Sequence, residues 1–586
     1  MEMFPRCKGG VMKRVLAGLS VIIILIIIAV MIIAFGGGRM RNKDMISLDE
    51  ERYMDKIRGA WLGKMVGVSL GIPTEFKFTN RIGSPEEVPV WTPDTIKKAF
   101  IEDDLYIPFA YMQVLKEKGI EVAPKEMTIS LYPYGFEFWG SHYEIYEKGV
   151  APPDSGHPNQ NRWADGLSYS FAGDYSGLIA MGQPNVPIEL ADKYGRLLVY
   201  GDGIFGGMYI GAMYSEALIN DNLEEIIQAG LDAVPKESWL YETISDTIKW
   251  YKETPDDFEA VWYKIMEKYF WNEKYNWIEW PYGGRIGGAN MDTKVNCAFI
   301  TLALLYGDYN VETTLETAIR LGGDSDCNPS NALGILFTTL GYSSIDQKYK
   351  EGLDLEEKFR YVNITFDEAA ELTYFLAKEV LIKNGGTVEK KNGTELLTIR
   401  KQEAVSAQNE NSLTPNRMSS SLFTEEEMSR MYKPYLQDPG FEESWHQAVF
   451  YPWRISYENG VYAGIDLNQG KSHSGENNAY LLNNQLNWAE LSQNRIKIKP
   501  NTTYYLSCYV KTSENFPGGE IGVRLPVFDG ISVLQKSEFS AEGEYSKVGV
   551  TFESQDNQII DIYIGYYGNN EDTWIQIDDF DLTEIN

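Results

Sequence analysis

The sequence predicts a multidomain protein with an N-terminal transmembrane helix, an all-α domain and a C-terminal all-β jelly-roll sandwich. Three observations carry this prediction. Residues 15–35 form an uncharged apolar run, apolar residues recur at helical spacing through residues 48–385, and apolar and polar residues alternate with a period of two from about residue 436. We therefore expect two folded domains that follow a membrane segment.

Length and charge limit the number of domains and the kinds of partner that the chain is expected to have. The chain has 586 residues, and at about 100–200 residues per domain this length predicts two or three domains. The net charge is −31, and because so acidic a surface repels phosphate we expect no nucleic-acid partner. The four cysteines form no CxxC pair and only four histidines are present. Neither a Cys/His zinc site nor a disulfide framework is therefore expected.

The apolar run of residues 15–35 is long enough to cross a bilayer core of about 30 Å. Basic residues flank it on both sides, and the AFGGG sequence at its end is a poor cleavage site for a signal peptide. We expect an uncleaved signal anchor that places residues 1–14 in the cytoplasm. The predicted localisation is the cell membrane, with a single pass and the bulk of the chain outside the cell.

The remaining chain divides into four predicted segments. Residues 48–385 are expected to be helical, and residues 386–403 to form a β-hairpin with Asn392-Gly393 as its turn. Residues 404–434 are polar and rich in Ser, Asn and Glu, which predicts a linker with little structure of its own. Residues 436–586 are expected to form the β-sandwich.

The first of three motifs spaces small residues along a helix. Gly59, Gly63 and Gly67 fall four residues apart and share one helix face, so another backbone can approach closely. Gly71 and Pro73 then end the helix. Glu75 lies just beyond the turn, as an ordinary surface acid or as a functional one.

The second and third motifs are acidic. Glu102, Asp103 and Asp104 precede a predicted helix, where they either cap the helix dipole or converge on a divalent cation. The later loop Gly322-Gly323-Asp324-Ser325-Asp326 opens another predicted helix. Its DxD spacing suits either an Asx-type cap or an oxygen cage for Mg²⁺ or Mn²⁺.

Taken together and in this order, the three motifs resemble the ADP-ribosylglycohydrolase family, which includes the dinitrogenase-reductase-activating glycohydrolases. The resemblance spans about residues 50–385. It implies an all-helical fold with two divalent cations in a central cleft, Mg²⁺ or alternatively Mn²⁺. It also implies hydrolysis of a glycosidic bond.

Two motifs of the family can be matched to this sequence residue by residue. The family's Thr-Asp-Asp-Thr appears here as Glu102-Asp103-Asp104-Leu105, and its Gly-Gly-Asp-Thr-Asp-Thr appears as residues 322–327. Cys327 replaces a metal-binding Thr, so either that ligand is lost or a different metal is preferred, because a thiol is a poor ligand for Mg²⁺. Val68 stands where the family usually has Asp. These departures predict a diverged branch with an altered substrate pocket.

The resemblance and the loop composition together define the expected site. The residues that we expect to be catalytic are Glu75, Asp103 and Asp326. The expected metal ligands are Glu102, Asp103, Asp104, Asp324 and Asp326. Turn-like loops on a helical scaffold, including residues 155–161, 163–165, 200–203 and 280–284, commonly bind ligands or serve as ordinary surface turns. The expected substrate-binding residues are His157, Asn161, Asp165, Asp202, Gly203 and Gly323.

The C-terminal segment weakly resembles the galactose-binding-like jelly rolls that serve as carbohydrate-binding modules. The resembling pieces are residues 438–442, 504–510 and 577–580. Aromatic rings can stack on sugars, and Trp445, Trp453, Trp488 and Tyr480 are candidates, although core packing is the alternative role for each of them. Such a fold need not bind sugar.

The sequence thus predicts a membrane-anchored, divalent-metal-dependent hydrolase that cleaves a glycosidic bond at a ribofuranose-like sugar. Its expected partners are a carbohydrate or ADP-ribosylated substrate and the membrane. An extracellular glycan is favoured by the predicted location and the sandwich, whereas the family resemblance favours ADP-ribosylated protein. A catalytically inactive, tethered glycan-binding protein is a third reading, supported by Leu105, Cys327 and the appended sandwich.

Overall fold

The computed structural model describes residues 45–585, apart from a set of short gaps. These gaps are residues 135–140, 142–143, 146–147, 162, 276–290, 392, 432–435, 443, 445–448, 450–451, 456–459, 527–531 and 541–542. Within the described chain, no helix combines the length and the apolarity that a membrane crossing requires. The predicted anchor at residues 15–35 lies outside the described residues.

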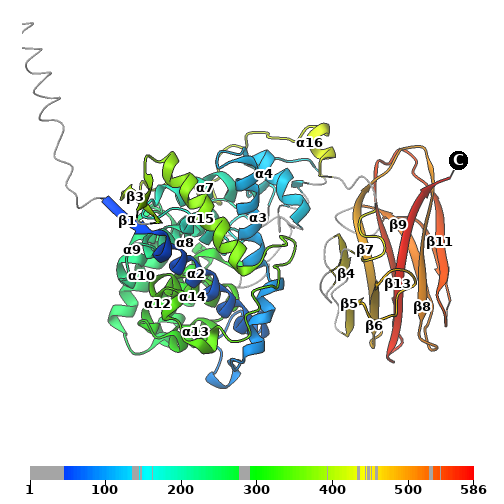
Figure 1. The fold of residues 1–586 in the computed structure, drawn as a ribbon, viewed down its shortest axis with the longest axis horizontal. Helices are drawn as coiled ribbons and strands as arrows, with labels where there is room; N and C mark the ends of the chain where they lie inside the picture. Colours follow the sequence, from blue (N-terminus) through cyan, green and yellow to red (C-terminus); the bar gives the residue numbers. More distant parts are fainter. Residues whose placement is uncertain are drawn as a thin grey trace, which may run out of the picture.

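The N-terminal body is built of helices, which confirms the predicted all-α domain (Figure 1). The helices that the structure describes in this body are α2 (Glu50–Gly71), α3 (Asp103–Lys118), α4 (Pro124–Leu131), α6 (Asp174–Leu178), α7 (Asn185–Tyr194), α8 (Asp202–Ala217), α9 (Leu223–Asp232), α10 (Trp239–Glu253), α11 (Phe258–Ile265), α12 (Thr293–Gly307), α13 (Val311–Leu321), α14 (Cys327–Leu340), α15 (Phe366–Lys383) and α16 (Glu425–Ser429).

Helices α2 and α14 run side by side along a seam of glycines. A Cβ atom built on any of four glycines of α2 would lie within 2.2–2.4 Å of a carbonyl oxygen at the GGDSD loop or on α14. The pairs are Gly59 with Phe337, Gly63 with Leu333, Gly67 with Pro329, and Gly71 with Ser325. The four-residue spacing thus allows the close backbone approach that the sequence predicts. It also brings the end of α2 against the loop that precedes α14.

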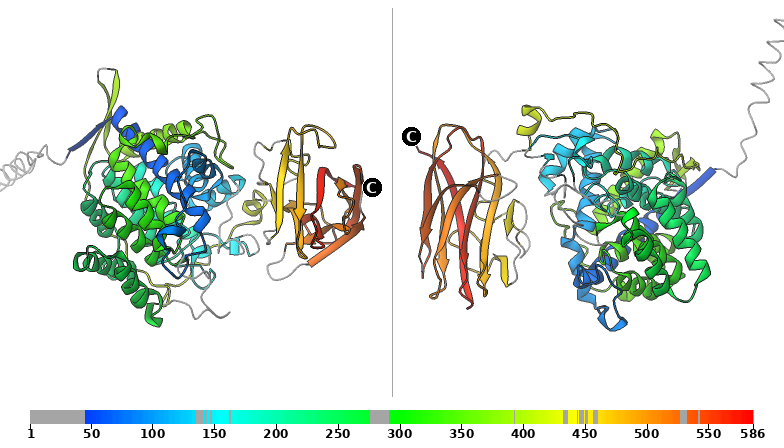
Figure 2. Two further views of the ribbon diagram at one scale, coloured as in Figure 1. Left: turned by 90° about the horizontal axis from the view of Figure 1, so that it is seen from below. Right: turned by 180° about the vertical axis from the view of Figure 1, so that it is seen from behind.

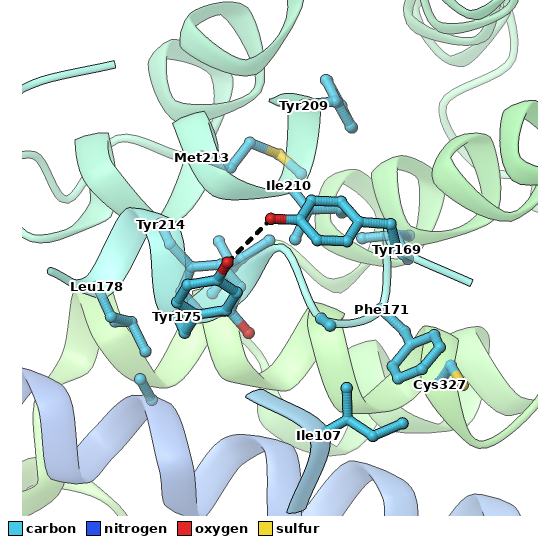
Figure 3. Close-up of a cluster of buried hydrophobic side chains, with 14 of the residues drawn as sticks. Ile107, Tyr169, Phe171, Tyr175, Leu178, Tyr209, Ile210, Met213, Tyr214 and Cys327 are labelled. Carbon is cyan, nitrogen blue, oxygen red and sulfur yellow. Dashed lines mark hydrogen bonds between the residues drawn. The ribbon is translucent and has the colours of Figure 1, made fainter. Parts of the chain in front are cut away.

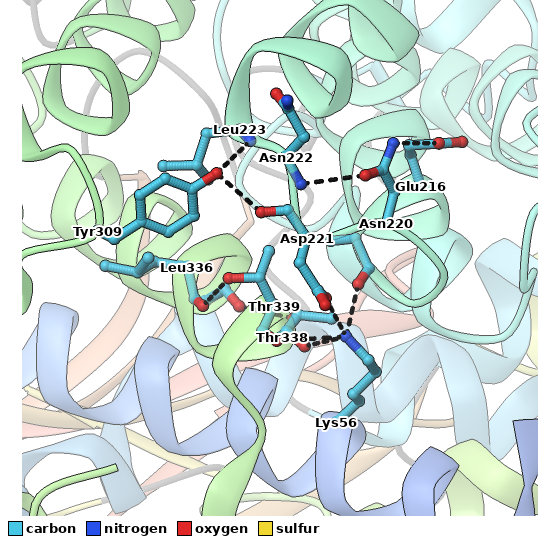
Figure 4. A network of polar contacts seen from close by, with 12 residues as sticks. Lys56, Glu216, Asn220, Asp221, Asn222, Leu223, Tyr309, Leu336, Thr338 and Thr339 are labelled. Carbon is cyan, nitrogen blue, oxygen red and sulfur yellow. Dashed lines mark hydrogen bonds and ion pairs between the residues drawn. The ribbon is translucent and has the colours of Figure 1, made fainter. Parts of the chain in front are cut away.

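A buried lysine on α2 joins the C-terminal ends of two other helices (Figure 4). Lys56 Nζ donates to the carbonyl oxygens of Ala217 at 3.1 Å, Thr338 at 3.0 Å and Thr339 at 3.3 Å, and forms an ion pair with Asp221 at 3.0 Å. Ala217 ends α8, and the two threonines lie in the last turn of α14. A cation is favourable there because the helix dipole is negative at its C-terminus.

The helical core is rich in tyrosine (Figure 3). The Tyr169 and Tyr175 hydroxyls lie 3.0 Å apart in a hydrogen bond, and Tyr111 stacks on Tyr175 with ring centroids 5.3 Å apart. The Tyr169 and Tyr175 rings fill the core while their hydroxyls pair with each other. Phe171 and Cys327 belong to the same buried cluster, which therefore reaches the first residue of α14.

A small antiparallel sheet closes one side of the helical domain. Strands β2 (Thr387–Lys391) and β3 (Thr394–Arg400) form a hairpin within the segment 386–403. Strand β1 (Met45–Asp49), which the sequence does not predict, pairs with β3 and leads directly into α2. Asn392, one of the two residues of the predicted turn, lies outside the described residues.

Residues 404–431, which we call the strap, lie in the segment that the sequence predicts to be a linker with little structure of its own. They lie against the loops of the helical domain and include the short helix α16. The carboxylate of buried Asp154 accepts hydrogen bonds from the backbone N–H groups of Ser419 at 2.9 Å and Ser421 at 2.8 Å. The Phe423 N–H donates to the Gly149 carbonyl at 2.7 Å. Backbone N–H groups of the strap thus serve as hydrogen-bond donors to polar groups of the loops.

The C-terminal body consists of two antiparallel sheets, which confirms the predicted all-β domain (Figures 1 and 2). One has the order β10-β9-β12-β7-β4 and the other β11-β8-β13-β6-β5. Side chains from both sheets form one apolar core. The strands are β4 (Trp453–Ile455), β5 (Val461–Leu467), β6 (Asn477–Asn483), β7 (Trp488–Lys497), β8 (Thr503–Thr512), β9 (Gly519–Leu525), β10 (Ser532–Phe539), β11 (Ser546–Glu553), β12 (Ile559–Tyr567) and β13 (Thr573–Glu584).

Candidate metal-binding active site

Three chain segments meet at the end of the α2–α14 seam. Glu75 follows α2, Glu102 is the N-cap of α3, and Asp326 is the N-cap of α14. The hydroxyls of Thr74 and Ser325, one from the turn after α2 and one from the GGDSD loop, lie 3.0 Å apart in a hydrogen bond. The glycine seam thus places acids from distant parts of the sequence beside one another.

The acids form two overlapping groups that share Asp326. Ligand atoms of Asp104, Asp326 and Cys327 all lie within 4.8 Å of one another, and so do those of Glu75, Asp324 and Asp326. The predicted ligands Glu102 and Asp103 belong to neither group, although both lie at the start of α3 next to Asp104. The structure therefore brings Asp104, Asp324 and Asp326 together with Glu75, and adds Cys327.

The electrostatics show an excess of negative charge. Burial, together with the charges of Asp326, Glu102 and Asp104, raises the pKa of Glu75 to about 8. Burial and the Asp326 charge raise the pKa of Glu102 to about 7. The pKa values of Asp103 and Asp324 are raised well above the usual range by burial and neighbouring carboxylates. Each carboxylate thus disfavours the ionised form of the others, as expected where positive charge is needed.

One buried cation partly balances the cluster. Lys64 Nζ on α2 contacts Asp104 Oδ1 at 3.3 Å and the Phe171 carbonyl at 2.9 Å, and it forms an ion pair with Asp174. All three ionised side chains are fully buried. Burial opposes the charge on Lys64, but Asp174 and Asp104 outweigh it and raise the pKa of Lys64. No pattern in the sequence singles out this lysine.

The donor set fits a divalent cation. Asp104 Oδ2 and Asp326 Oδ1 are buried and have no hydrogen-bond partner among the described residues. Buried carboxylate oxygens without partners are costly unless a cation or a proton satisfies them. Carboxylate oxygens are the ligands that Mg²⁺ and Mn²⁺ prefer, so the cluster matches the expected cation chemistry.

Two of the expected substrate-binding residues serve the fold. His157 is buried, its Nε2 is hydrogen-bonded to the Asn416 carbonyl of the strap at 2.8 Å, and its Nδ1 accepts from the Asn159 N–H. Asn161 is buried and spans two loops, because its side chain donates to the Leu198 carbonyl and accepts from the Trp163 N–H. The polar groups of both side chains are therefore already engaged within the protein.

Asp165 and Asp202 form a second acidic group beside the strap. Asp165 Oδ1 accepts a hydrogen bond from Ser412 Oγ at 2.6 Å, while Asp165 Oδ2 is buried without a partner among the described residues. Asp202 Oδ1 accepts from the Leu240 N–H at 3.1 Å. Burial raises the pKa of Asp165 to about 8 and that of Asp202 to about 6. The sequence does not indicate Ser412, because the polar composition of its segment predicts a linker.

The two expected glycines permit close packing. A Cβ on Gly203 would lie 2.6 Å from the Ala164 carbonyl oxygen. Gly323 has φ +64° and a Cβ there would lie 2.5 Å from Asn296 Oδ1, whose oxygen also accepts from the Asp324 N–H at 2.9 Å. Gly323 therefore shapes the acidic loop. The predicted pocket stretch 280–284 lies outside the described residues.

The sandwich carries aromatic rings on one sheet. Trp488 on β7 pairs with exposed Tyr567 on β12, with ring centroids 5.2 Å apart. Glu490 on β7 receives a bidentate ion pair from Arg524 on β9, at 2.7 and 3.0 Å. In contrast, Trp453 is buried in the core, and Trp445 lies outside the described residues.

Comparison with known proteins identifies a family for the helical domain. A family model described as ADP-ribosylglycohydrolase matches residues 49–380, and a search of curated proteins finds no match. Among solved structures, TmCBM61 in complex with β-1,4-galactotriose is similar at 23% identity and TM-score 0.21, covering 26% of this chain and 99% of that chain. The CBM22-1 xylan-binding domain from Paenibacillus barcinonensis Xyn10C is similar at 12% identity and TM-score 0.18, covering 24% and 91%.

Proposed function

The chain belongs to the ADP-ribosylglycohydrolase family, and from that premise we propose that its helical domain is a divalent-metal-dependent hydrolase acting at a ribofuranose-like sugar. The observation that carries the proposal is the convergence of Glu75, Asp104, Asp324 and Asp326, with two buried carboxylate oxygens that lack partners among the described residues. A buried acid excess of this kind is typical of a site that holds cations.

Each residue of the site would have a role that follows from its position. Asp104, Asp324 and Asp326 would hold the cations, with Glu102 and Asp103 close by. When bound, divalent cations supply a positive charge that orients sugar hydroxyls and lowers the pKa of water. Glu75 is the more exposed acid of its group, so it is placed to exchange a proton with substrate or water. The surrounding carboxylates would stabilise positive charge that develops at the anomeric carbon.

An extracellular glycan is the substrate that we favour. The proposal rests on the apolar run at residues 15–35, which predicts an anchored chain with its bulk outside the cell, and on the appended β-sandwich. On the sandwich, the Trp488 and Tyr567 rings beside the Arg524–Glu490 pair combine stacking and hydrogen-bonding groups that suit a sugar. The position of Asp165 near the strap adds a candidate substrate contact in the helical domain.

An ADP-ribosylated protein is the second candidate substrate, because the family match covers most of the helical domain. The third reading, an inactive glycan-binding protein, is less well supported because both acid pairs, Asp103-Asp104 and Asp324-x-Asp326, are present.

The test uses the full chain with Mg²⁺ or Mn²⁺, or with EDTA, against mixed polysaccharides and ADP-ribosylated peptides. Released products are identified by mass spectrometry. Metal-dependent release of free sugar supports the glycan proposal, whereas free ADP-ribose supports the second candidate. Asp326→Asn is expected to lower the release more than about a hundredfold, and Asp256→Asn, at an exposed position away from the acid cluster, serves as the control. Undiminished release by the Asp326 variant would refute the metal mechanism.

A further inference from the structure

The group of potential ligands formed by Asp104, Asp326 and Cys327 contains a sulfur atom. Cys327 is the first residue of α14 and is 8% exposed. Its Sγ and one carboxylate oxygen each of Asp104 and Asp326 lie within 4.8 Å of one another. Three potential ligand atoms from two chain segments therefore face the same small volume.

Each of the two carboxylates in this group has one unsatisfied oxygen. Asp104 Oδ2 and Asp326 Oδ1 are buried, and no described residue gives them a hydrogen bond. The other oxygen of Asp104 is already in contact with Lys64 Nζ at 3.3 Å. The lysine therefore fixes one side of the Asp104 carboxylate and leaves the other side for a further positive group.

The other described cysteines show what a structural cysteine looks like in this chain. Cys297 in α12 and Cys508 in β8 are free, fully buried and part of apolar cores. Neither belongs to a group of potential metal ligands among the described residues. Burial alone therefore does not distinguish Cys327, whereas its two carboxylate neighbours do.

We propose that Cys327 Sγ is a direct ligand of a cation held with Asp104 and Asp326, and that this mixed sulfur–oxygen site prefers a borderline first-row cation such as Zn²⁺ to Mg²⁺. Sulfur donors favour softer cations, while Mg²⁺ requires oxygen ligands in a near-ideal octahedron. The thiol proton leaves to solvent when sulfur binds. The inference rests on the proposed function only in placing a cation at this site.

The test measures metal binding rather than turnover. Zn²⁺ and Mg²⁺ affinities of the full chain are determined by calorimetry for the wild type, Cys327→Ser and Cys297→Ser. We expect Cys327→Ser to weaken Zn²⁺ binding at least about tenfold, with Mg²⁺ binding changed much less. The Cys297→Ser control is expected to leave both affinities unchanged. An equal loss for the two metals, or no loss, overturns the proposal.

A spectroscopic measurement keeps the proposal testable even if the serine variant does not fold. X-ray absorption of the wild-type chain loaded with one equivalent of Zn²⁺ is expected to show a sulfur shell at about 2.3 Å, which Cys297→Ser retains. A shell of only oxygen or nitrogen at about 2.0–2.2 Å overturns the proposal while leaving the metal-dependent hydrolase intact. Failure of the chain to bind either Zn²⁺ or Mg²⁺ would instead refute the cation site itself, and with it both proposals.

Discussion

Helix α2 carries two buried lysines, eight residues apart, whose surroundings differ. Lys56 lies against carbonyl oxygens at the ends of α8 and α14, and its ion-pair partner among the described residues is Asp221 (Figure 4). Lys64 lies between two fully buried carboxylates, those of Asp104 and Asp174. Burial lowers the pKa of Lys56, with Asp221 opposing it, whereas the two acids raise the pKa of Lys64 despite burial.

The difference separates a buried charge that its neighbours balance from one that lies within an excess of opposite charge. An ammonium among helix-end carbonyls stabilises the ends of two helices and leaves no charge unbalanced. The ammonium of Lys64 balances only part of a larger acidic cluster, so further positive charge is needed beside it. A buried lysine therefore marks a cation site only when its partners are surplus carboxylates.

The largest effect that we expect comes from removing the second of these charges. Lys64→Met should lower the free energy of unfolding of the helical domain by about 3–5 kcal/mol, because Asp104 and Asp174 lose a buried counter-ion. Urea unfolding followed by hydrogen exchange of helical-domain peptides measures this loss without averaging over the sandwich.

A double variant shows whether the loss comes from charge. Lys64→Met with Asp174→Asn should recover much of the stability, because removing both partners leaves less uncompensated charge. If Lys64→Met alone were as stable as the wild type, the distinction between the two lysines would fail.

A smaller effect is expected at the first lysine. Lys56→Met should cost about 1–3 kcal/mol, because it leaves helix-end carbonyls without their donor. Its Zn²⁺ and Mg²⁺ affinities, measured by calorimetry, should equal those of the wild type. A loss of metal affinity in this variant would show that the two lysines are coupled rather than distinct.

The two lysines also illustrate how much of the structure can be predicted from the sequence alone. The α2 seam was predictable because a spacing of four residues fixes one helix face, and the acid motifs were predictable because each lies within one short segment. The Lys64 pairing was not, because Asp174 is distant in the sequence and only the packing of α6 brings it near. The contacts of the strap could not be predicted, because polar composition does not reveal whether a segment faces water or buried loop groups.

Sequence alone is equally ambiguous for the loops that it predicts to bind substrate. His157 and Asn161 are polar residues in turn-like sequence, a pattern that suits ligand binding and internal hydrogen bonding equally. Only the contacts with Asn416 and Leu198 show that both are engaged within the protein.

The last effect, a change of stability with pH, tests an intermediate case, the buried carboxyl of Asp165. Its pKa is raised to about 8, first by burial and then by Asp202, with Ser412 opposing the shift, whereas an unfolded Asp titrates near about 4. The folded state therefore holds a proton that the unfolded state releases. The contribution of this group to stability is complete below about pH 4 and is lost as the pH rises through 8, at up to about 1.4 kcal/mol per pH unit. Asp165→Asn should remove this slope from urea unfolding measured in chelator between pH 5 and 8. If the free energy of unfolding changed with pH equally in wild type and variant, Asp165 would be compensated as fully as Lys56. An unpartnered oxygen alone would then not indicate unbalanced charge.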